Sequence, residues 1–430
     1  MMATETLDGM SRRNLIRTAG QGVVLAGLGG GLVESANGQE PQPRPVSPPK
    51  EIPLPPFDAP TEQKSGKAPT PWPPEGRVGF ALVGLGRLTI EELMPAFVQT
   101  ERAKPTALVT GDRAKGLELA RQYGIPERSV LTYAEYDRLR DLNEVQAVYV
   151  VLPNGMHEEY VNRTVGLGKH VLCEKPMAND SPQAQRMVEA AKRANRKLMI
   201  AYRIQYEPLN TLAKEWTRSQ KWGKVKLIDM VNVQNQGEPD QWRHKKALAG
   251  GGSLPDIGLY CLNTARFVLG EEPVEVLATI YSTPGDPRFR EVEENCLWQM
   301  RFPSGAQANC LTGYGAHNSK RYRIYAERAW YGLDPAFSYG GLQMEGSYAE
   351  GEVEYGIRPK KNAKSQFALE IDHFAQCIMD DKHPYTPGEE GVQDHRIMEA
   401  IYESARTGKP VRLPEVKGLD AFRGEPPKPG

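Results

Sequence analysis

The fold is decided by ALVGLG, residues 81–86, in which an apolar run ends in two glycines one residue apart. Residues 78–83 predict a buried strand and residues 90–99 predict a helix. Glycine lets a backbone approach a pyrophosphate closely, and a helix N-terminus favours its negative charge. This order of strand, glycine loop and helix predicts a dinucleotide-binding loop. Thr89 occupies the third fingerprint position, where glycine is usual, so the motif alone leaves an ordinary tight turn open.

Strands and helices alternate after this loop. We expect strands at residues 106–110, 145–152, 170–173 and 198–201, and helices at 113–123, 157–166 and 181–195. Such alternation is typical of parallel βαβ units. It predicts an α/β domain over residues 77–204, a Rossmann fold with a doubly wound parallel sheet.

Longer alternating strands follow residue 205, at 225–233, 274–281, 294–302, 306–312 and 321–327. Helices are expected at 255–269, 367–380 and 391–405. Hairpin-like turns such as Pro303-Ser304-Gly305 join the strands. The pattern predicts a C-terminal α+β domain at 205–415, with a large, open and mostly antiparallel sheet, whose final helix packs back on the Rossmann domain. Residues 416–430 are expected to be a tail.

The N-terminal region contains SRRNLIR at residues 11–17, then a glycine-rich apolar run too short to cross a bilayer. With small residues at 35–37, this predicts a twin-arginine signal peptide at 1–38, and thus export to the periplasm without membrane insertion of the mature chain. A disordered tail that merely contains the arginine pair is the alternative. Thirteen of the 35 prolines lie at 41–74, so residues 39–76 are expected to form an extended, proline-rich arm.

The composition excludes several classes of function. Lys plus Arg and Asp plus Glu both number 54 in the 430 residues, so net charge favours neither a nucleic-acid nor a membrane partner. The five cysteines are widely spaced and odd in number, which fits neither a disulfide framework nor a metal site. We therefore predict no metal and expect the cysteines to be buried as small apolar residues.

Residues after the second expected strand indicate which dinucleotide fits. NAD enzymes place an acid on the ribose 2′-hydroxyl about twenty residues after the glycine loop. Here the strand ends at Thr110, and Asp112, Arg113 and Lys115 follow. A hydroxyl with two cations suits a 2′-phosphate better than a carboxylate would, so NADP is favoured. Asp112 keeps NAD as the alternative.

Two further motifs carry candidate catalytic side chains. Lys175 lies before a proline in CEKPM, residues 173–177, which holds it at the carboxyl end of the sheet, where ligands bind. Asp256 and Tyr260 follow a glycine run at 250–252 and are four residues apart, so they share one face of a helix. Tyrosine needs a nearby cation to act as a base at neutral pH, and Lys175 is the candidate. A surface lysine and a packing tyrosine are the plainer alternatives.

These residues resemble the Gfo/Idh/MocA superfamily and, within it, the glucose–fructose oxidoreductases. The resemblance covers nearly all of residues 78–411. It rests on ALVGLG and on VLPN (151–154), GKHVLCEKPMA (168–178), KLMIAYRIQYEPLN (197–210), QWR (241–243), GGGSLPDIGLYCLN (250–263), GEEGVQD (388–394) and AIYESARTGKPV (400–411). EKP alone marks the superfamily, and the glycine–Asp–Tyr block is more specific.

The resemblance implies that Lys175, Asp256 and Tyr260 are catalytic and that the cofactor is a tightly bound NADP. The implied cofactor-binding residues are Gly84, Leu85, Gly86, Arg87, Thr110, Lys115, Tyr133, Leu152, Pro153, Asn154, His157, Glu174, Lys175, Arg203, Trp242 and Arg243. It also implies a homotetramer or homodimer formed partly through the open sheet. The N-terminal arm is longer than its counterpart in the family and matches it poorly.

The implied reaction moves a hydride between two sugars. Tyr260, assisted by Lys175, takes the proton of the anomeric hydroxyl of a cyclic, glucose-like aldose, and a lactone leaves; Asp256 orients a sugar hydroxyl. A fructose-like ketose or an aldose is then reduced to an alditol. Export by the twin-arginine machinery suits a cofactor loaded before export and regenerated in place. The alternatives are a sugar or inositol dehydrogenase with exchangeable NAD(P), a non-catalytic sugar or nucleotide sensor, and an NAD-using glycosidase.

Overall fold

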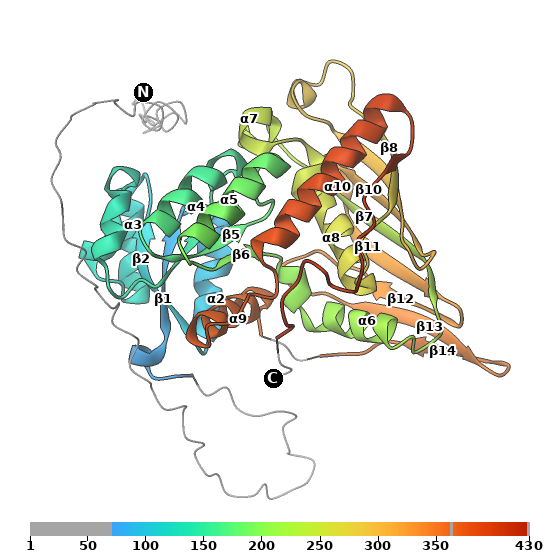
Figure 1. Cartoon of the computed structure of the whole chain (residues 1–430), viewed down its shortest axis with the longest axis horizontal. Coiled ribbons are helices and arrows are strands. Elements are labelled where there is room, and N and C mark those ends of the chain that lie inside the picture. Colours follow the sequence, from blue (N-terminus) through green and yellow to red (C-terminus); the bar gives the residue numbers. More distant parts are fainter. Residues whose placement is uncertain (1–70, 362–363, 428–430) are drawn as a thin grey trace, which may run out of the picture. The chain divides into compact units, whose positions relative to one another are not determined.

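Six parallel strands form the first sheet of the computed structural model, which describes residues 71–361 and 364–427. The strands are β1 (Val78–Val83), β2 (Ala103–Val109), β3 (Val130–Leu131), β4 (Ala147–Val150), β5 (His170–Glu174) and β6 (Leu198–Ala201). Their order, β3-β2-β1-β4-β5-β6, confirms the doubly wound Rossmann sheet (Figure 1). The predicted signal peptide and most of the proline-rich arm lie outside the described residues.

The helices of this domain follow the expected alternation. They are α2 (Met94–Gln99), α3 (Arg113–Tyr123), α4 (His157–Gly166) and α5 (Ser181–Arg193). A wide π-type turn at Leu88–Leu93 precedes α2, so the helical segment starts two residues earlier than expected. β2 also begins earlier than expected, at Ala103. All six residues of β1 are buried, as a strand covered on both faces requires.

Nine strands form the second sheet, in the order β14-β13-β12-β11-β7-β10-β9-β8-β15. They are β7 (Val225–Asn235), β8 (Glu275–Tyr281), β9 (Asn295–Arg301), β10 (Gln307–Gly313), β11 (Gly315–Ala326), β12 (Ala329–Leu333), β13 (Met344–Glu350), β14 (Val353–Ile357) and β15 (Val411–Arg412). Only β10 and β7 pair in parallel among these strands, which confirms the mostly antiparallel sheet. The sequence did not predict β12, β13 and β14.

Helices cover one face of the second sheet. α8 (Leu259–Leu269) contacts β7 and β10, α6 (Pro208–Arg218) contacts β12, and α10 (Gly388–Thr407) contacts β8 as well as α5 and β6 of the first domain. α9 (Gln366–Met379) packs on α2 and β1. On the opposite face, Leu227, Leu277 and Leu297 are exposed, so this face of the sheet is open. α6 was not predicted, although Pro208 and the Glu207 cap are ordinary helix-start signals.

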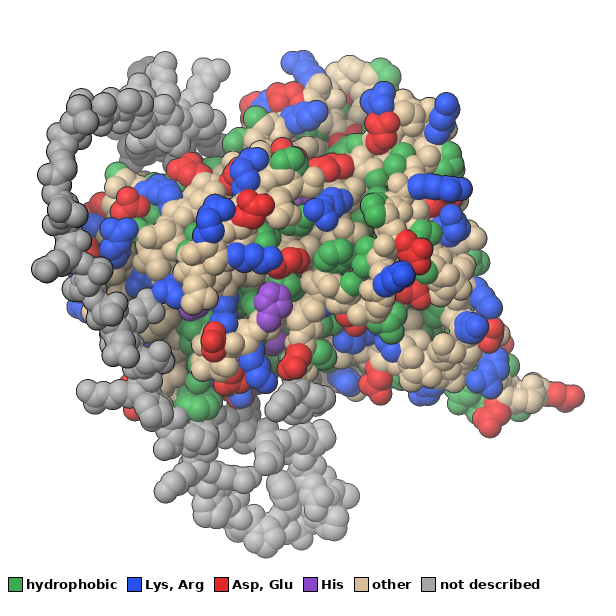
Figure 2. Space-filling view, in the orientation of Figure 1, with side chains coloured by type: hydrophobic (Ala, Val, Ile, Leu, Met, Phe, Trp, Pro, Cys, Tyr) green, Lys and Arg blue, Asp and Glu red, His purple; other side chains and the backbone are tan. Residues whose placement is uncertain are grey.

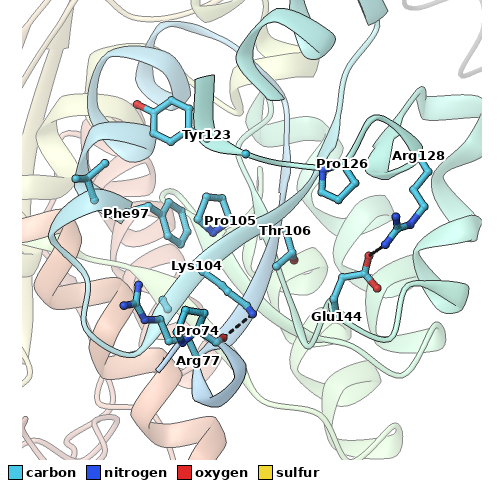
Figure 3. Close-up of a pocket in the computed structure, with 13 residues that line it drawn as sticks. Pro74, Arg77, Phe97, Lys104, Pro105, Thr106, Tyr123, Pro126, Arg128 and Glu144 are labelled. Carbon is cyan, nitrogen blue, oxygen red and sulfur yellow. Dashed lines mark hydrogen bonds and ion pairs between the residues drawn. The ribbon is translucent and has the colours of Figure 1, made fainter. Parts of the chain in front are cut away.

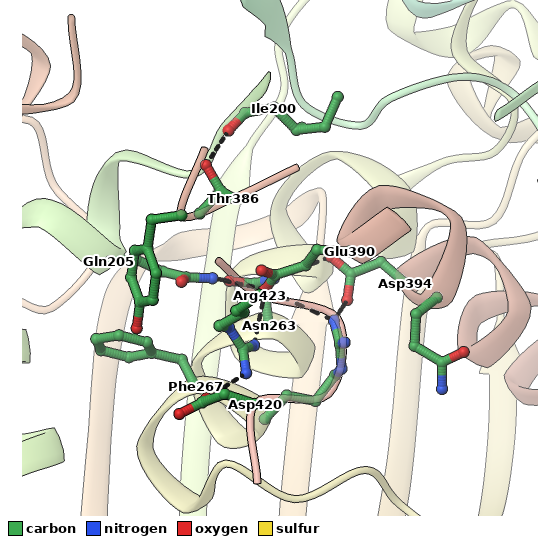
Figure 4. Close-up of polar contacts among 12 residues, drawn as sticks. Ile200, Gln205, Asn263, Phe267, Thr386, Glu390, Asp394, Asp420 and Arg423 are labelled. Carbon is green, nitrogen blue, oxygen red and sulfur yellow. Dashed lines mark hydrogen bonds and ion pairs between the residues drawn. The ribbon is translucent and has the colours of Figure 1, made fainter. Parts of the chain in front are cut away.

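The C-terminal segment is anchored by the ion pairs of buried Arg423 (Figure 4). Arg423 donates to Glu390 at 2.7 Å and to Asp420 at 3.0 Å, and its side chain is fully buried. Asp420 also accepts a hydrogen bond from Arg218 on α6 at 3.0 Å. This segment therefore ties α10 to α6.

The surface carries mixed charge, and the cysteines lie in the interior. Figure 2 shows Lys and Arg side chains interspersed with Asp and Glu over the visible face. All five cysteines are free and buried, as expected. Among the described residues, no helix is long and apolar enough to span a membrane. No cluster of three or more His, Cys, Asp or Glu side chains in the same part of the chain could hold a metal ion.

Candidate active site

The glycine loop after β1 has the geometry that a dinucleotide needs. Gly84 has φ +95°, and a Cβ there would lie 2.2 Å from the Val151 carbonyl oxygen, so only glycine fits. A Cβ on Gly86 would meet nothing within 4 Å, which leaves this backbone open to a ligand. Buried Thr89 donates to the Gly84 carbonyl at 2.5 Å. Thr89 thus closes the loop at the position where the fingerprint has a third glycine.

The corner after β2 commits its acid to the helix that follows. The Asp112 carboxylate accepts a hydrogen bond from the Lys115 backbone N–H at 3.0 Å and so caps α3. The Asp112 N–H donates to the Thr110 hydroxyl oxygen at 3.1 Å. Arg113 donates to the Val130 carbonyl at 2.6 Å, and the Lys115 side chain is exposed. Among the predicted NADP ligands after β2, Lys115 therefore has its charge exposed to solvent.

Other predicted cofactor residues hold the loops that border the site. Asn154 Nδ2 donates to the Ala249 carbonyl at 2.8 Å, just before the glycine run at 250–252. Buried His157 places its ring nitrogens 2.9 Å from the Leu152 carbonyl and 3.0 Å from the Pro176 carbonyl. Both side chains thus join the ends of β4 and β5 to neighbouring loops. Their direct contact with a dinucleotide stays a prediction.

The remaining predicted cofactor residues are distributed around the same carboxyl edge. Leu85 is buried and Arg87 is exposed in the glycine loop, and Pro153 is half-buried after β4. Tyr133 packs edge-on against Tyr160 at 5.8 Å, and burial raises the pKa of its phenol to about 12. Trp242 lies 4.5 Å from the guanidinium carbon of Arg243.

Lys175 follows the end of β5, where its ammonium contacts the segment that leads into the helix with Asp256 and Tyr260. Its Nζ donates to the Asp256 carbonyl oxygen at 2.8 Å and lies 3.4 Å from Asp256 Oδ1. The same nitrogen lies 4.5 Å from the centre of the Tyr260 ring. Burial would lower the pKa of Lys175, but Tyr260, Asp256 and Glu174 together raise it. Lys175 is therefore a charged lysine beside the candidate tyrosine.

Asp256 is held as a carboxylate by three neighbours. Its Oδ2 accepts hydrogen bonds from Arg243 Nε at 3.0 Å and from the Tyr314 hydroxyl at 2.7 Å. Although burial raises the pKa of Asp256, Arg243 and Lys175 hold it well below its ordinary value. The residue is thus ionised at neutral pH, with Oδ1 facing Lys175.

Tyr260 is oriented by its ring. The ring stacks on Phe337 with the centroids 5.8 Å apart, and the Arg203 guanidinium lies 4.8 Å from its centre. Arg203 itself is fixed by hydrogen bonds to the Phe337 carbonyl at 2.7 Å and to Gln366 at 2.8 Å. The Tyr260 hydroxyl has no hydrogen-bond partner within residues 71–361 and 364–427. Two cations therefore face the ring, and the oxygen remains available to a substrate.

Glu174 belongs to the buried layer beneath Lys175. Its carboxylate accepts a hydrogen bond from the Tyr149 hydroxyl at 2.7 Å, and burial raises its pKa. The structure thus brings Glu174 and Arg203 next to the predicted catalytic residues.

A buried glutamate that the sequence analysis missed supports the glycine loop that precedes Asp256. The Glu293 carboxylate accepts hydrogen bonds from the backbone N–H groups of Gly252 at 2.8 Å and Leu254 at 2.9 Å. The Tyr402 hydroxyl donates to it at 3.1 Å. It therefore positions the turn that leads to Asp256. Sequence alone offered no signal, because Glu293 is 41 residues from Gly252.

The second sheet contributes further residues that were missed. Tyr314 follows β10, and Lys320 pairs in register with Asn232 of β7, whose side chain donates to the Ile257 carbonyl at 2.8 Å. Burial lowers the pKa of Lys320, and nearby Tyr260 partly opposes this effect. No hydrogen bond or ion pair joins the Lys320 ammonium to a described residue. The strand predicted at residues 321–327 begins one residue after Lys320, so the prediction left this lysine out.

The first domain also contains a cavity (Figure 3). It measures about 570 Å³ and lies at the amino ends of β1 and β2, whereas Gly84 and Lys175 follow the carboxyl ends of their strands. Phe97, Lys104 and Arg128 are among its lining residues. In open α/β sheets, ligands bind at the carboxyl ends, so this cavity is not the candidate active site.

Two family models match most of the described chain. Residues 78–202 match the oxidoreductase family with an NAD-binding Rossmann fold, and residues 211–331 match the GFO/IDH/MocA C-terminal domain. The chain belongs to the Gfo/Idh/MocA family. This membership confirms the resemblance drawn from the sequence motifs.

The similar proteins act on sugars. D-xylose 1-dehydrogenase [NADP(+)] of Haloarcula marismortui is 33% identical over 344 residues, which cover 78% of this chain and 93% of the relative. The crystal structure of aldose–aldose oxidoreductase from Caulobacter crescentus is 41% identical, with a TM-score of 0.76 and coverage of 78% of this chain and 100% of that one. Levoglucosan dehydrogenase, 19% identical with a TM-score of 0.69, shares the fold over 79% of this chain and 100% of its own. The protein is a sugar oxidoreductase of the Gfo/Idh/MocA family with an NAD(P)-binding Rossmann domain.

Proposed function

We propose that this protein carries tightly bound NADP and couples the oxidation of a cyclic, glucose-like aldose to the reduction of a second sugar. The observation that carries the proposal is the cluster of Lys175, Asp256 and Tyr260 at the carboxyl end of β5. It combines an ionised acid, a cation and a phenol in the domain that carries the glycine loop. These are the groups that proton transfer at a sugar hydroxyl requires.

The glycine loop fits a dinucleotide, since Gly86 is open and Gly84 adopts a backbone that only glycine tolerates. Backbone around Gly84 and Gly86 would hold the pyrophosphate, and Lys115 would face the 2′-phosphate of NADP. When bound, the nicotinamide supplies the hydride acceptor for one sugar and the donor for the other.

Tyr260 moves the proton in this proposal. As a phenolate it takes the proton of the anomeric hydroxyl of the aldose, which loses its C1 hydrogen as hydride and leaves as a lactone; the resulting phenol returns the proton to the second sugar, which also gains a hydride and leaves as an alditol. Lys175 and Arg203 stabilise the phenolate through the ring face. Asp256 Oδ1 accepts a hydrogen bond from a sugar hydroxyl, because Arg243 and Tyr314 already occupy Oδ2.

The relative named aldose–aldose oxidoreductase supports a cycle that two sugars close, and it favours an aldose as well as a ketose for the second one. The arginine pair Arg12-Arg13 supports export of the folded protein to the periplasm by the twin-arginine machinery. A cofactor carried across in this way has no soluble pool to reoxidise it. Tight retention and regeneration by a second sugar follow from that situation.

A sugar dehydrogenase with an exchangeable cofactor is the second candidate function. The 33% identity to an NADP-dependent xylose dehydrogenase favours an ordinary sugar dehydrogenase, whose catalytic cluster would be the same. A non-catalytic sensor is less consistent with the ionised Asp256 beside Lys175, because sensing requires no proton relay.

Denaturing the purified full chain and identifying the released nucleotide by chromatography tests the proposal. We expect about one NADP per chain, as one Rossmann site holds one dinucleotide. Release of no nucleotide, with turnover only after NAD(P) is added, would favour the exchangeable alternative. Replacing Arg12 and Arg13 with Lys should shift the protein from the periplasmic to the cytoplasmic fraction, whereas Arg17→Lys should not.

A further inference from the structure

β14 forms one edge of the nine-stranded sheet, and that edge is exposed. With β13 it makes a hairpin that turns at Gly351 and Glu352, and acidic side chains gather at the tip (Figure 2). Val353 and Tyr355 of β14 are 52% and 42% exposed. The unpaired backbone groups of such an edge are a template for pairing with another strand.

The register of the hairpin determines which backbone groups face outward. Glu350 pairs with Val353 across the two-residue turn. Residues that flank such a turn exchange backbone hydrogen bonds, and these pairs alternate along an antiparallel ladder. Val353, Tyr355 and Ile357 therefore direct their N–H and C=O groups toward β13. Within β14 the outward groups belong to Glu354 and Gly356, and an extension of the strand by one residue adds Arg358.

Side chains of the same segment form two different faces. Within β14, one face is apolar and holds Val353, Tyr355 and Ile357, and the other holds Glu354 and Gly356. The charge of the sequence changes sign at Gly356, with Glu352 and Glu354 before it and, directly after the strand, Arg358 and Lys360. This pattern is self-complementary when two copies run in opposite directions about Gly356. Glu354 then lies opposite Arg358 of the partner subunit.

We propose that β14 pairs antiparallel with β14 of a second copy of this chain, about a two-fold axis at Gly356. The outward N–H and C=O groups of the two strands then bond each other. Tyr355 lies opposite Ile357 of the partner subunit, an aromatic and β-branched pair of the kind that stabilises sheets. The proposal is independent of the proposed function.

Three details of the hairpin are compatible with this pairing. Pro359 has no N–H, but it lies beyond β14, which ends at Ile357, so the strand itself loses no donor. A Cβ on Gly356 would meet nothing within 4 Å, so nothing in the chain blocks the axis. Tyr355 stacks on Tyr348 at 5.2 Å, and Tyr348 stacks on Trp222 at 5.8 Å. The pairing continues this aromatic row into the second copy.

Reversing the charge of Glu354 or Arg358 tests the β14–β14 contact and leaves its apolar residues unchanged. Glu354→Arg or Arg358→Glu sets like charges opposite each other twice per pair, so the dissociation constant measured by sedimentation should rise roughly tenfold or more. The double variant should restore the affinity, because the opposite charges meet again. Glu350→Arg on β13 changes net charge equally and should have little effect. A monomeric unmodified chain, or single variants that sediment like it, would overturn the proposal.

Cross-linking at the axis tests the register directly. In the proposed pair only residue 356 meets itself, at a Cα separation of about 5.5 Å that a disulfide spans. Gly356→Cys should therefore form a covalent dimer on mild oxidation, and Val353→Cys should not. The native cysteines are buried and give little background. Absence of a Gly356→Cys dimer, or equal yields from both variants, would contradict the pairing.

Discussion

The ammonium nitrogen of Lys175 lies 4.5 Å from the centre of the Tyr260 ring, and it also donates to the backbone carbonyl of Asp256 at 2.8 Å. One lysine at the end of β5 thus joins the first domain to the segment that carries the other two catalytic candidates. The cation faces the ring rather than the hydroxyl. The Tyr260 oxygen therefore remains free for a sugar.

Tyr260→Phe removes the proposed proton acceptor and retains the ring that stacks on Phe337. Turnover with sugars should fall by about 10²–10⁴-fold, the usual contribution of a positioned acid or base. The thermal midpoint and the amount of bound nucleotide should change little. Tyr281→Phe, at an exposed site on β8, is the matched control. Near-normal turnover of Tyr260→Phe would refute the assignment.

Lys320→Met tests whether the half-buried lysine of β11 binds substrate. Its ammonium has no partner among the described residues and lies near Tyr260, so a sugar hydroxyl is the expected partner. A lost hydrogen bond to a charged group should raise the KM for the sugar by roughly tenfold, with a smaller change in kcat. Steady-state kinetics would show this. Lys226→Met, on exposed β7 surface, should leave KM unchanged.

Glu293→Gln weakens the support of the glycine turn. An amide offers one acceptor oxygen where the carboxylate accepts from Gly252, Leu254 and Tyr402. The free energy of unfolding should fall by about 1–3 kcal/mol, measured by urea titration. Exposed Glu291, which accepts from the Lys246 N–H at 3.0 Å, provides the control Glu291→Gln. Equal midpoints for the two variants would exclude the positioning role.

His395 makes stability depend on acid pH. Burial lowers its pKa to about 3, and its Nε2 accepts a hydrogen bond from the Ala178 N–H at 3.0 Å. In the unfolded chain the His395 imidazole binds a proton below about pH 6.5, whereas in the folded chain it stays neutral down to about pH 3. The contribution of His395 to the free energy of unfolding should therefore fall as pH drops from about 6.5 toward 3, by up to about 1.4 kcal/mol per unit, and should be constant above that range.

His395→Gln, which retains an acceptor, should reduce this acid-dependent loss in urea titrations between about pH 7 and about pH 5. His317→Gln on exposed β11 should keep the full slope. Identical slopes for both variants would show that His395 does not carry the effect.

The parallel sheet was predictable because its strands are buried on both faces and read as apolar runs, as in β1. The β13–β14 hairpin was missed because an exposed, charged strand such as β14 has no apolar run of that kind. α6 was missed although its signals were present. Its apolar residues also recur at helical spacing, with Leu209 and Ala213 on the buried face, so both the start and the pattern were readable.

The catalytic candidates were predictable because each lies in a short motif, close in sequence to the strand or helix that positions it. Lys175 follows a strand directly, and Asp256 and Tyr260 share one helix face. Glu293, Tyr314 and Lys320 reach the same cluster from distant strands or loops. No spacing in the sequence encodes those contacts, since the fold of the second sheet creates them.

The absorbance of the purified full chain near the reduced nicotinamide band tests the central claim most directly. Without added nucleotide, an aldose should produce the band, and a second sugar should remove it, over repeated cycles. Tyr260→Phe should show neither change at a comparable rate. A protein without a nicotinamide signal, or one whose band persists after every second sugar tried, would contradict the two-sugar account.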